Sequence, residues 1–297
     1  MNISVLITYY RGSKYIENTF FSILKALNLI NGDHEILIVN DSNNEEEEKF
    51  LIKLVAESSS IVHNVKIAVI NNINNFGVTE SRRIGISKLN GDAIHIIDQD
   101  DLIDEKFYFQ AIKSLNKGEK AIVFNGFKID ENGKIIKKNL FKHKNLSTLE
   151  KKLNNVNTYF TGVCHIITPG MIVFSRDVKD VIYEIYEFMS LNNKKRIFDA
   201  IDDYYLYVFL LQRNIKFKYL NQYLFFKRVH KDSQRNRKEA QIKLIESSNL
   251  LYSKGVFQGR NCIKKTAKFI LDIENRKYYV LPKHIFTILR YIKSVYY

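Results

Sequence analysis

The first half of the chain alternates short apolar runs with amphipathic stretches, and this alternation constrains the fold more than any other feature. The apolar runs predict buried strands, and the stretches between them repeat apolar residues at helical spacing. Alternating strands and helices build a mostly parallel sheet with helices on both faces, so we predict an α/β fold. The predicted strands are 3–8, 35–40, 65–71, 93–98 and 121–127, and the predicted helices are 15–29, 45–57, 78–89 and 105–115.

Polar residues gather where these predicted strands end. The carboxyl ends of parallel strands meet at one edge of a sheet, and ligands of such sheets bind there. We therefore expect a binding site at this edge. The segments concerned are 8–10, 40–42, 72–77 and 98–101.

The fourth strand runs directly into three carboxylates, Asp98, Asp100 and Asp101. Clustered carboxylates repel one another unless a cation neutralises them. Oxygen ligands suit Mg²⁺ and Mn²⁺, which bind through one or two carboxylates while substrate phosphates fill other positions. We predict a divalent metal, Mn²⁺ or Mg²⁺, that binds a diphosphate. The alternative is an acidic turn that ends the strand and caps a helix near Asp104.

The second half of the chain is less regular. Asn132 and Gly133 predict the turn of a hairpin over 128–138. The polar segment 142–157 indicates a loop or short helix. The remaining predictions are strands at 171–174, 216–219 and 223–226, helices at 176–190 and 201–212, and helices from 238 to the end.

The formal charge of +14 comes from the last third of the chain, since residues 211–297 hold 20 Lys and Arg against 5 Asp and Glu. Such asymmetry favours an anionic partner, which could be a membrane surface, a phosphate-bearing substrate or nucleic acid. The alternative is an ordinary solvated surface. No nucleic-acid motif occurs, so we expect no nucleic-acid partner.

No apolar run is long enough for a spanning helix, and the N-terminus lacks a leader pattern, so we expect a cytoplasmic protein. Cys164 and Cys262 lie far apart without metal-ligand spacing, and we expect them to be buried free thiols. In segment 281–296 apolar residues recur at helical spacing with basic residues off that stripe. This basic amphipathic helix could contact the membrane peripherally, or it could pack on the protein.

Four segments together resemble the family-2 glycosyltransferases: 8–10, 39–42, 75–85 and 98–101 follow the order and approximate spacing of that family's motifs. The likeness extends to about Ser233. It implies a GT-A fold over 1–235, with a nucleotide-sugar-binding half at 1–127 and an acceptor-binding half at 128–235. Residues 236–297 would form a basic helical C-terminal extension.

The resemblance implies that Thr8, Tyr10 and Asp41 hold the base and ribose of a nucleotide-sugar donor. Asn40 stands where the family usually has a second Asp. Asp41 could instead cap the helix near Asn44. The arginine of the family's third motif is Arg82 here, whose planar fork of donors suits a phosphate or the nucleotide.

By the same resemblance, Asp100 binds the metal directly, Asp98 reaches the ribose or a metal-bound water, and Asp101 is not a direct ligand. His230, in segment 228–233, resembles a family histidine that approaches the metal or the diphosphate. Segment 162–170 corresponds to a region that forms part of the acceptor pocket in that family. Thr161, His165 and Thr168 could face that pocket.

Asp202 and Asp203 resemble the family's Glu-Asp pair, which implies a general base for the acceptor hydroxyl. We rank Asp203 first and Asp202 second, and Asp199 also precedes the predicted helix. The alternative is plain capping of the helix by these carboxylates.

The leading hypothesis is an inverting, metal-dependent glycosyltransferase that uses a nucleotide-diphosphate donor, with a UDP-sugar favoured. The acceptor would be a glycan or a lipid-linked saccharide in surface polysaccharide biosynthesis. A sugar-phosphate nucleotidyltransferase is an alternative, although its family has a glycine-rich loop after the first strand and segment 9–13 is poor in glycine. A catalytically silent, anion-binding relative is another.

Overall fold

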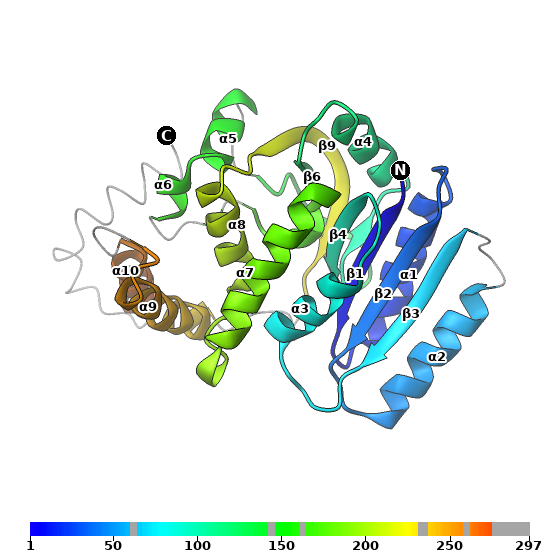
Figure 1. Ribbon diagram of the computed structural model, residues 1–297, viewed down its shortest axis with the longest axis horizontal. Coiled ribbons are helices and arrows are strands. Elements are labelled where there is room, and N and C mark those ends of the chain that lie inside the picture. The colour runs from blue at the N-terminus through cyan, green and yellow to red at the C-terminus, as the bar shows by residue number, and fades with distance from the viewer. Residues whose placement is uncertain are drawn as a thin grey trace.

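The computed structural model describes residues 1–59, 64–141, 146–160, 164, 166–230, 237–257 and 262–274. Within them, nine strands form one mixed sheet in the order β3-β2-β1-β4-β8-β6-β9-β5, with β7 paired to β6 (Figure 1). The strands are β1 Ile3–Tyr9, β2 His34–Asn40, β3 Val65–Asn71, β4 Ala93–Asp98, β5 Leu102–Ile103, β6 Ala121–Ile129, β7 Ile135–Lys138, β8 Ile172–Ser175 and β9 Phe217–Arg228.

Helices cover both faces of the sheet. Each crossover between parallel strands is expected to be right-handed, and the chain turns back after β3, so α3 lies on the opposite face from α1 and α2. The contacts agree, because α1 packs with α2 and α4, whereas α3 packs with α7 (Figure 1). The helices are α1 Ser13–Leu27, α2 Glu45–Ser59, α3 Val78–Lys88, α4 Phe107–Leu115, α5 Leu146–Leu153, α6 Val156–Tyr159, α7 Lys179–Leu191, α8 Asp202–Gln212, α9 Arg237–Ser253 and α10 Cys262–Glu274.

The parallel strands β1, β2 and β4 bring their polar ends to the same edge of the sheet. Thr8 pairs with Val39 on one side and with Asp98 on the other, and Tyr9 pairs with Asn40. All seven residues of β1 are buried, as expected for a strand covered on both faces. The α/β prediction is confirmed. The five strands predicted for the first half match β1, β2, β3, β4 and β6 to within about a residue or two at each end, whereas β5 was not predicted.

The second half of the chain completes the sheet in an order that periodicity did not predict. Strand β8 inserts antiparallel between β4 and β6, and β9 runs parallel to β6. Two separate strands were predicted at 216–219 and 223–226, and this prediction was wrong, because β9 is continuous. Asn221 and Gln222 interrupt the apolar pattern, and the pairing absorbs them by a register shift opposite Phe124 and Asn125.

Helix α8 is buried along nearly its whole length, from Asp202 to Leu211. It contacts α7 and α6, so no face of it meets water and its sequence carries no amphipathic stripe. The predicted hairpin at 128–138 is present, with Gly133 at positive φ in its turn. The predicted helix at 176–190 begins as a single 3-10 turn, Arg176–Val178, before α7.

Two buried histidines have structural roles. His95 on β4 accepts a hydrogen bond from the Tyr108 hydroxyl and donates one to the Gly170 carbonyl, at 2.8 and 2.9 Å. Burial lowers the pKa of His95 to about 4, so the ring is neutral near pH 7. His34 accepts a hydrogen bond from the backbone of Ile3.

Cys164 carries a reduced thiol that donates to the Ile166 carbonyl, but it is exposed rather than buried, which corrects that expectation. Of the helices that the structure describes, none combines the length and apolar character needed to cross a bilayer. The amphipathic segment predicted at 281–296 lies outside the described residues, as do Thr161 and His165.

Candidate active site

A cleft of about 850 Å³ opens where β1, β2 and β4 end. Of the binding and catalytic residues predicted from sequence, Thr168, Asp202 and Asp203 are absent from its lining, and the last two lie in the buried first turn of α8. The polar edge of the sheet and the cleft therefore coincide. The predicted residues that do line it are Thr8, Tyr10, Asp41, Arg82, Asp98, Asp100 and His230.

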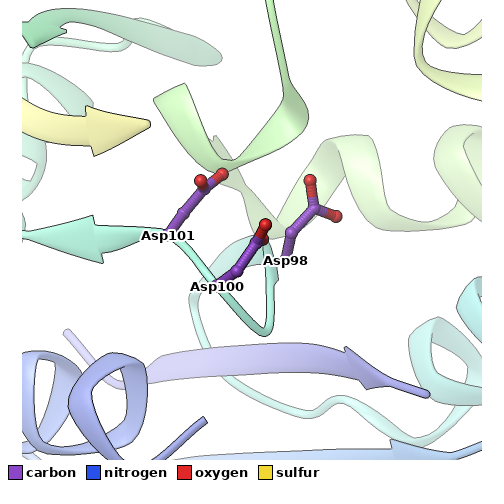
Figure 2. Close-up of side chains that lie close together, drawn as sticks. All are labelled: Asp98, Asp100 and Asp101. Atoms are coloured by element: carbon purple, nitrogen blue, oxygen red, sulfur yellow. The ribbon is translucent and has the colours of Figure 1, made fainter. Parts of the chain in front are cut away.

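Three carboxylates gather in the turn that follows β4. Ligand atoms of Asp98, Asp100 and Asp101 lie within 4.8 Å of one another. Figure 2 shows all three side chains rising from the turn on the same side. Asp98 is a quarter exposed, whereas Asp101 is fully buried. An all-oxygen set at this spacing could hold a hard divalent cation, with Asp98 and Asp100 on the cleft side.

Asp98 and Asp101 share Lys227 as a partner, whereas Asp100 contacts His230. Asp100 Oδ2 lies 3.0 Å from His230 Nε2. Asp101 accepts hydrogen bonds from the Lys227 ammonium at 3.0 Å and from the Arg228 backbone at 3.1 Å. None of these contacts caps α4, so the reading of the acids as a helix cap is wrong. Asp101 is hydrogen-bonded to β9, and its exclusion as a direct metal ligand stays a prediction.

Lys227 supplies positive charge beneath the acidic turn. Its Nζ lies 3.4 Å from Asp98 Oδ2 in addition to its contact with Asp101. Burial alone would lower the pKa of Lys227. The neighbouring carboxylates, above all Asp101, outweigh that effect and raise the pKa of Lys227 above its ordinary value. Lys227 therefore stays charged and offsets part of the repulsion among the acids.

Arg82 on α3 connects the acidic turn to the start of α8. Its Nη2 donates to Asp98 at 2.7 Å, and its Nη1 donates to Asp202 and, at 3.3 Å, to the Tyr186 hydroxyl. Its side chain is 2% exposed. Burial alone would lower the pKa of Arg82, yet the charges of Asp202 and Asp98 keep it well above its ordinary value. Both terminal nitrogens are thus bonded to protein carboxylates, and a contact with donor phosphate stays a prediction.

The acids around the start of α8 differ in their surroundings. Asp202 is fully buried and accepts from Arg82 and, at 3.2 Å, from Tyr186. Asp203 is 6% exposed, and its Oδ1 accepts from the Tyr204 backbone at 2.8 Å. Asp199 lines the cleft and accepts from the Thr79 hydroxyl at 2.7 Å. Sequence reasoning ranked Asp203 before Asp202 by resemblance alone, and the structure gives each of the three carboxylates its own environment.

Asp41 holds the loop between β3 and α3. Its Oδ1 accepts from the Asn72 side chain and the Phe76 backbone, and its Oδ2 accepts from the Gly77 backbone, all at 2.8 Å. Gly77 adopts φ +90°, which favours glycine. The cap of α2 is Asn44, whose Oδ1 accepts from two backbone N–H groups of the first turn, so the alternative role of Asp41 as that cap is wrong.

Several residues of the cleft were not singled out from the sequence as binding residues. Tyr15 packs against the His230 ring, with 4.6 Å between ring centroids. Thr168, assigned by resemblance to the acceptor pocket, donates to Asp98 Oδ2 at 3.1 Å. Arg11, Asn75 and Gln99 lie in loops that follow strands, a position that could have flagged them. The other such residues are Lys14, Tyr15, Arg196 and Lys227.

Replacing Arg82 with methionine is expected to lower the free energy of unfolding by about 3–5 kcal/mol, because Asp202 would be left as an uncompensated buried charge. Urea unfolding measures the loss. Adding Asp202→Asn to this variant removes the stranded charge and is expected to recover much of the stability. If the free energy of unfolding of the Arg82→Met variant lay within about 1 kcal/mol of the wild-type value, the structural role of this pair would be contradicted.

Residues 4–182 match the family model described as glycosyl transferase family 2. Comparison with curated protein sequences finds no match. Among solved structures, S. aureus TarS 1–349 in complex with UDP-GlcNAc has a TM-score of 0.57 at 14% identity, covering 99% of this chain and 82% of that chain. The mannosyltransferase PcManGT from Pyrobaculum calidifontis, in complex with GDP-Man and Mn²⁺, has a TM-score of 0.58 at 12% identity. The match covers 97% of this chain and 74% of the PcManGT chain.

A longer structure of TarS matches 91% of this chain with a TM-score of 0.54. This chain covers only 43% of the length of that TarS chain. At such identities the likenesses establish the fold, and they confirm the GT-A prediction with helices C-terminal to the sheet. The family model covers more than half of the chain. On the sequence match, therefore, this chain belongs to glycosyl transferase family 2, a family of glycosyltransferases.

Proposed function

We propose that this protein is an inverting, metal-dependent glycosyltransferase that takes a sugar from a nucleotide-diphosphate donor, with a UDP-sugar favoured. One observation carries the proposal. The acidic turn after β4 lines a cleft, and Arg82 connects it to the acid pair that begins α8. Such an arrangement brings a candidate metal site and a candidate base into one structural unit.

On the donor side, Thr8, Tyr10 and Asp41 would contact the base and ribose, since all three line the cleft beside the acidic turn. Asp100, Asp98 and His230 would hold Mn²⁺ or Mg²⁺. A bound divalent cation would neutralise the charge that grows on the diphosphate as it leaves. Relatives of this fold bind comparable molecules: TarS was solved with UDP-GlcNAc, and PcManGT with GDP-Man and Mn²⁺.

On the acceptor side, Asp203 would take the proton of the attacking hydroxyl while the new glycosidic bond forms and the bond to the diphosphate breaks. Its neighbour supports this choice. Asp202 already accepts hydrogen bonds from Arg82 and Tyr186, so that carboxylate is occupied in orienting the first turn of α8. We assign Asp202 to positioning and Asp203 to proton transfer.

We further propose that the acceptor is a glycan or a lipid-linked saccharide of surface polysaccharide biosynthesis, and that the protein acts in the cytoplasm with peripheral membrane contact. The support is electrostatic: the last third of the chain is strongly basic and would be attracted to anionic lipid. We also propose the domain division into 1–127, 128–235 and 236–297.

The test is nucleotide release from UDP-GlcNAc, other UDP-sugars and GDP-Man, with Mn²⁺, Mg²⁺ or EDTA, and with saccharide acceptors of lipid-linked and free type. We expect turnover with one UDP-sugar and a divalent cation, and none with EDTA. Metal-independent turnover would overturn the proposal. Release of pyrophosphate from a nucleoside triphosphate and a sugar 1-phosphate would instead identify a nucleotidyltransferase.

A further inference from the structure

Gln99, which lies between the candidate metal ligands Asp98 and Asp100, contacts the neighbouring loop that follows β1. The side-chain amide of Gln99 bonds both backbone groups of Tyr10: its Oε1 accepts from the Tyr10 N–H at 2.7 Å, and its Nε2 donates to the Tyr10 carbonyl at 3.0 Å. Asp98 and Asp100 flank Gln99 in the chain. The turn that carries the candidate metal ligands is thereby joined directly to the loop proposed to hold the nucleotide.

The contact extends the pairing of two strands beyond their ends. The parallel ladder between β1 and β4 ends at the pair Thr8 and Asp98. One amide side chain then supplies the acceptor and donor that a further backbone pair would have supplied. The backbone of Gln99 is fixed as well, because the Thr19 hydroxyl on α1 donates to its carbonyl at 2.7 Å. Both ends of the residue are therefore held in place.

Gly12 leaves the space in which this amide lies. A Cβ atom at Gly12 would come within 2.3 Å of both Cδ and Oε1 of Gln99. The φ of Gly12 is −110°, which other residues adopt without strain, so the requirement for glycine here is spatial. A methyl group at this position would displace the amide, which is the far end of a flexible side chain.

We propose that Gln99 is a positioning residue that couples metal binding to nucleotide binding. This inference rests on the proposed function for the identity of the two ligands. A loop held in its binding geometry before the ligand arrives does not have to be ordered on binding, so the nucleotide binds more tightly. Because Gln99 joins the metal turn to Tyr10, ordering of that turn by Mn²⁺ would also order the nucleotide loop, and the reverse must hold equally.

The experiment compares wild type with Gln99→Ala, Gly12→Ala and the double variant. Isothermal titration gives the dissociation constants of Mn²⁺ alone, UDP alone, and UDP with saturating Mn²⁺. In both single variants we expect UDP with Mn²⁺ to bind about tenfold more weakly, as two lost hydrogen bonds would produce. The enhancement of UDP binding by Mn²⁺ should shrink, and the affinity for Mn²⁺ alone should change less than about twofold.

The double variant separates positioning from general damage. If Gly12→Ala acts by displacing the Gln99 amide, the double variant binds UDP no more weakly than either single variant. Additive losses, or an unchanged Mn²⁺ enhancement in Gln99→Ala, would overturn the inference. Since Gly12→Ala leaves residues 98–101 intact, a defect shared by both variants does not come from altered metal ligands.

A readout without ligand distinguishes this inference from the proposed function. Amide hydrogen exchange of the Tyr10 N–H should speed up in Gln99→Ala and in Gly12→Ala, because its acceptor is lost. If wild type does not bind UDP while this exchange still accelerates, the proposed donor is wrong and the contact stands. Equal exchange in wild type and both variants would rule out the contact itself.

Discussion

Replacing Asp100 with asparagine is expected to reduce kcat/KM for the UDP-sugar by about a thousandfold. The exchange keeps the shape of the side chain but removes a negative charge that would face the cation. It also weakens the contact of Asp100 with His230, the other candidate ligand. A divalent cation is worth several kcal/mol to the departing diphosphate, and each 1.36 kcal/mol changes the rate tenfold. Steady-state nucleotide release measures the loss, and titration with Mn²⁺ should show weaker metal binding.

Stability distinguishes a lost metal site from a damaged fold. The three acids of the turn repel one another in the absence of metal, so removing one charge should leave the melting temperature within about 3 °C of wild type when metal is chelated. Asp33→Asn is the matched control, since Asp33 is exposed and lies outside the cleft, and its kcat/KM should not change. Turnover of Asp100→Asn within about tenfold of wild type would contradict the assigned metal site.

The strand positions of the first half and their mostly parallel pairing were accessible from sequence, because apolar runs that alternate with helical spacing are local patterns. Strands β1 to β4 are apolar on both sides, and the polar residues that follow them meet at one edge by the geometry of parallel pairing. Asp41 and Asp98 could therefore be assigned to one site before any coordinates were known. The motifs added the candidate donor-binding residues, and the match to the family model confirmed the family.

The contacts that organise the site join residues far apart in the chain, and no local pattern reports them. Arg82 and Asp202 are 120 residues apart, and Lys227 and Asp101 are 126 apart. Periodicity cannot say that β9 returns beside β6, and that return is what brings Lys227 beneath the acidic turn. Asp202 and Asp203 are adjacent aspartates, so the sequence does not distinguish their surroundings. The packing of the folded chain shows that Asp202 is fully buried against Arg82.

Replacing Asp203 with asparagine is expected to lower kcat by about a thousandfold, while the KM for the UDP-sugar changes little. A positioned base contributes about 10²–10⁴-fold to proton transfer, and asparagine cannot accept the proton of the acceptor hydroxyl. The donor would bind on the residues that line the cleft, which this exchange leaves untouched because Asp203 is not among them. Titration with UDP should therefore give the wild-type affinity even where turnover is lost.

The comparison with Asp199→Asn decides which carboxylate is the base. Asp199 lines the cleft but accepts hydrogen bonds from Thr79 and Asn193, so asparagine should keep part of this network and lower kcat less than about tenfold. If Asp199→Asn instead loses about a thousandfold and Asp203→Asn retains turnover, the base is Asp199. The burial of Asp203 at 6% exposure would then reflect a purely structural role at the start of α8.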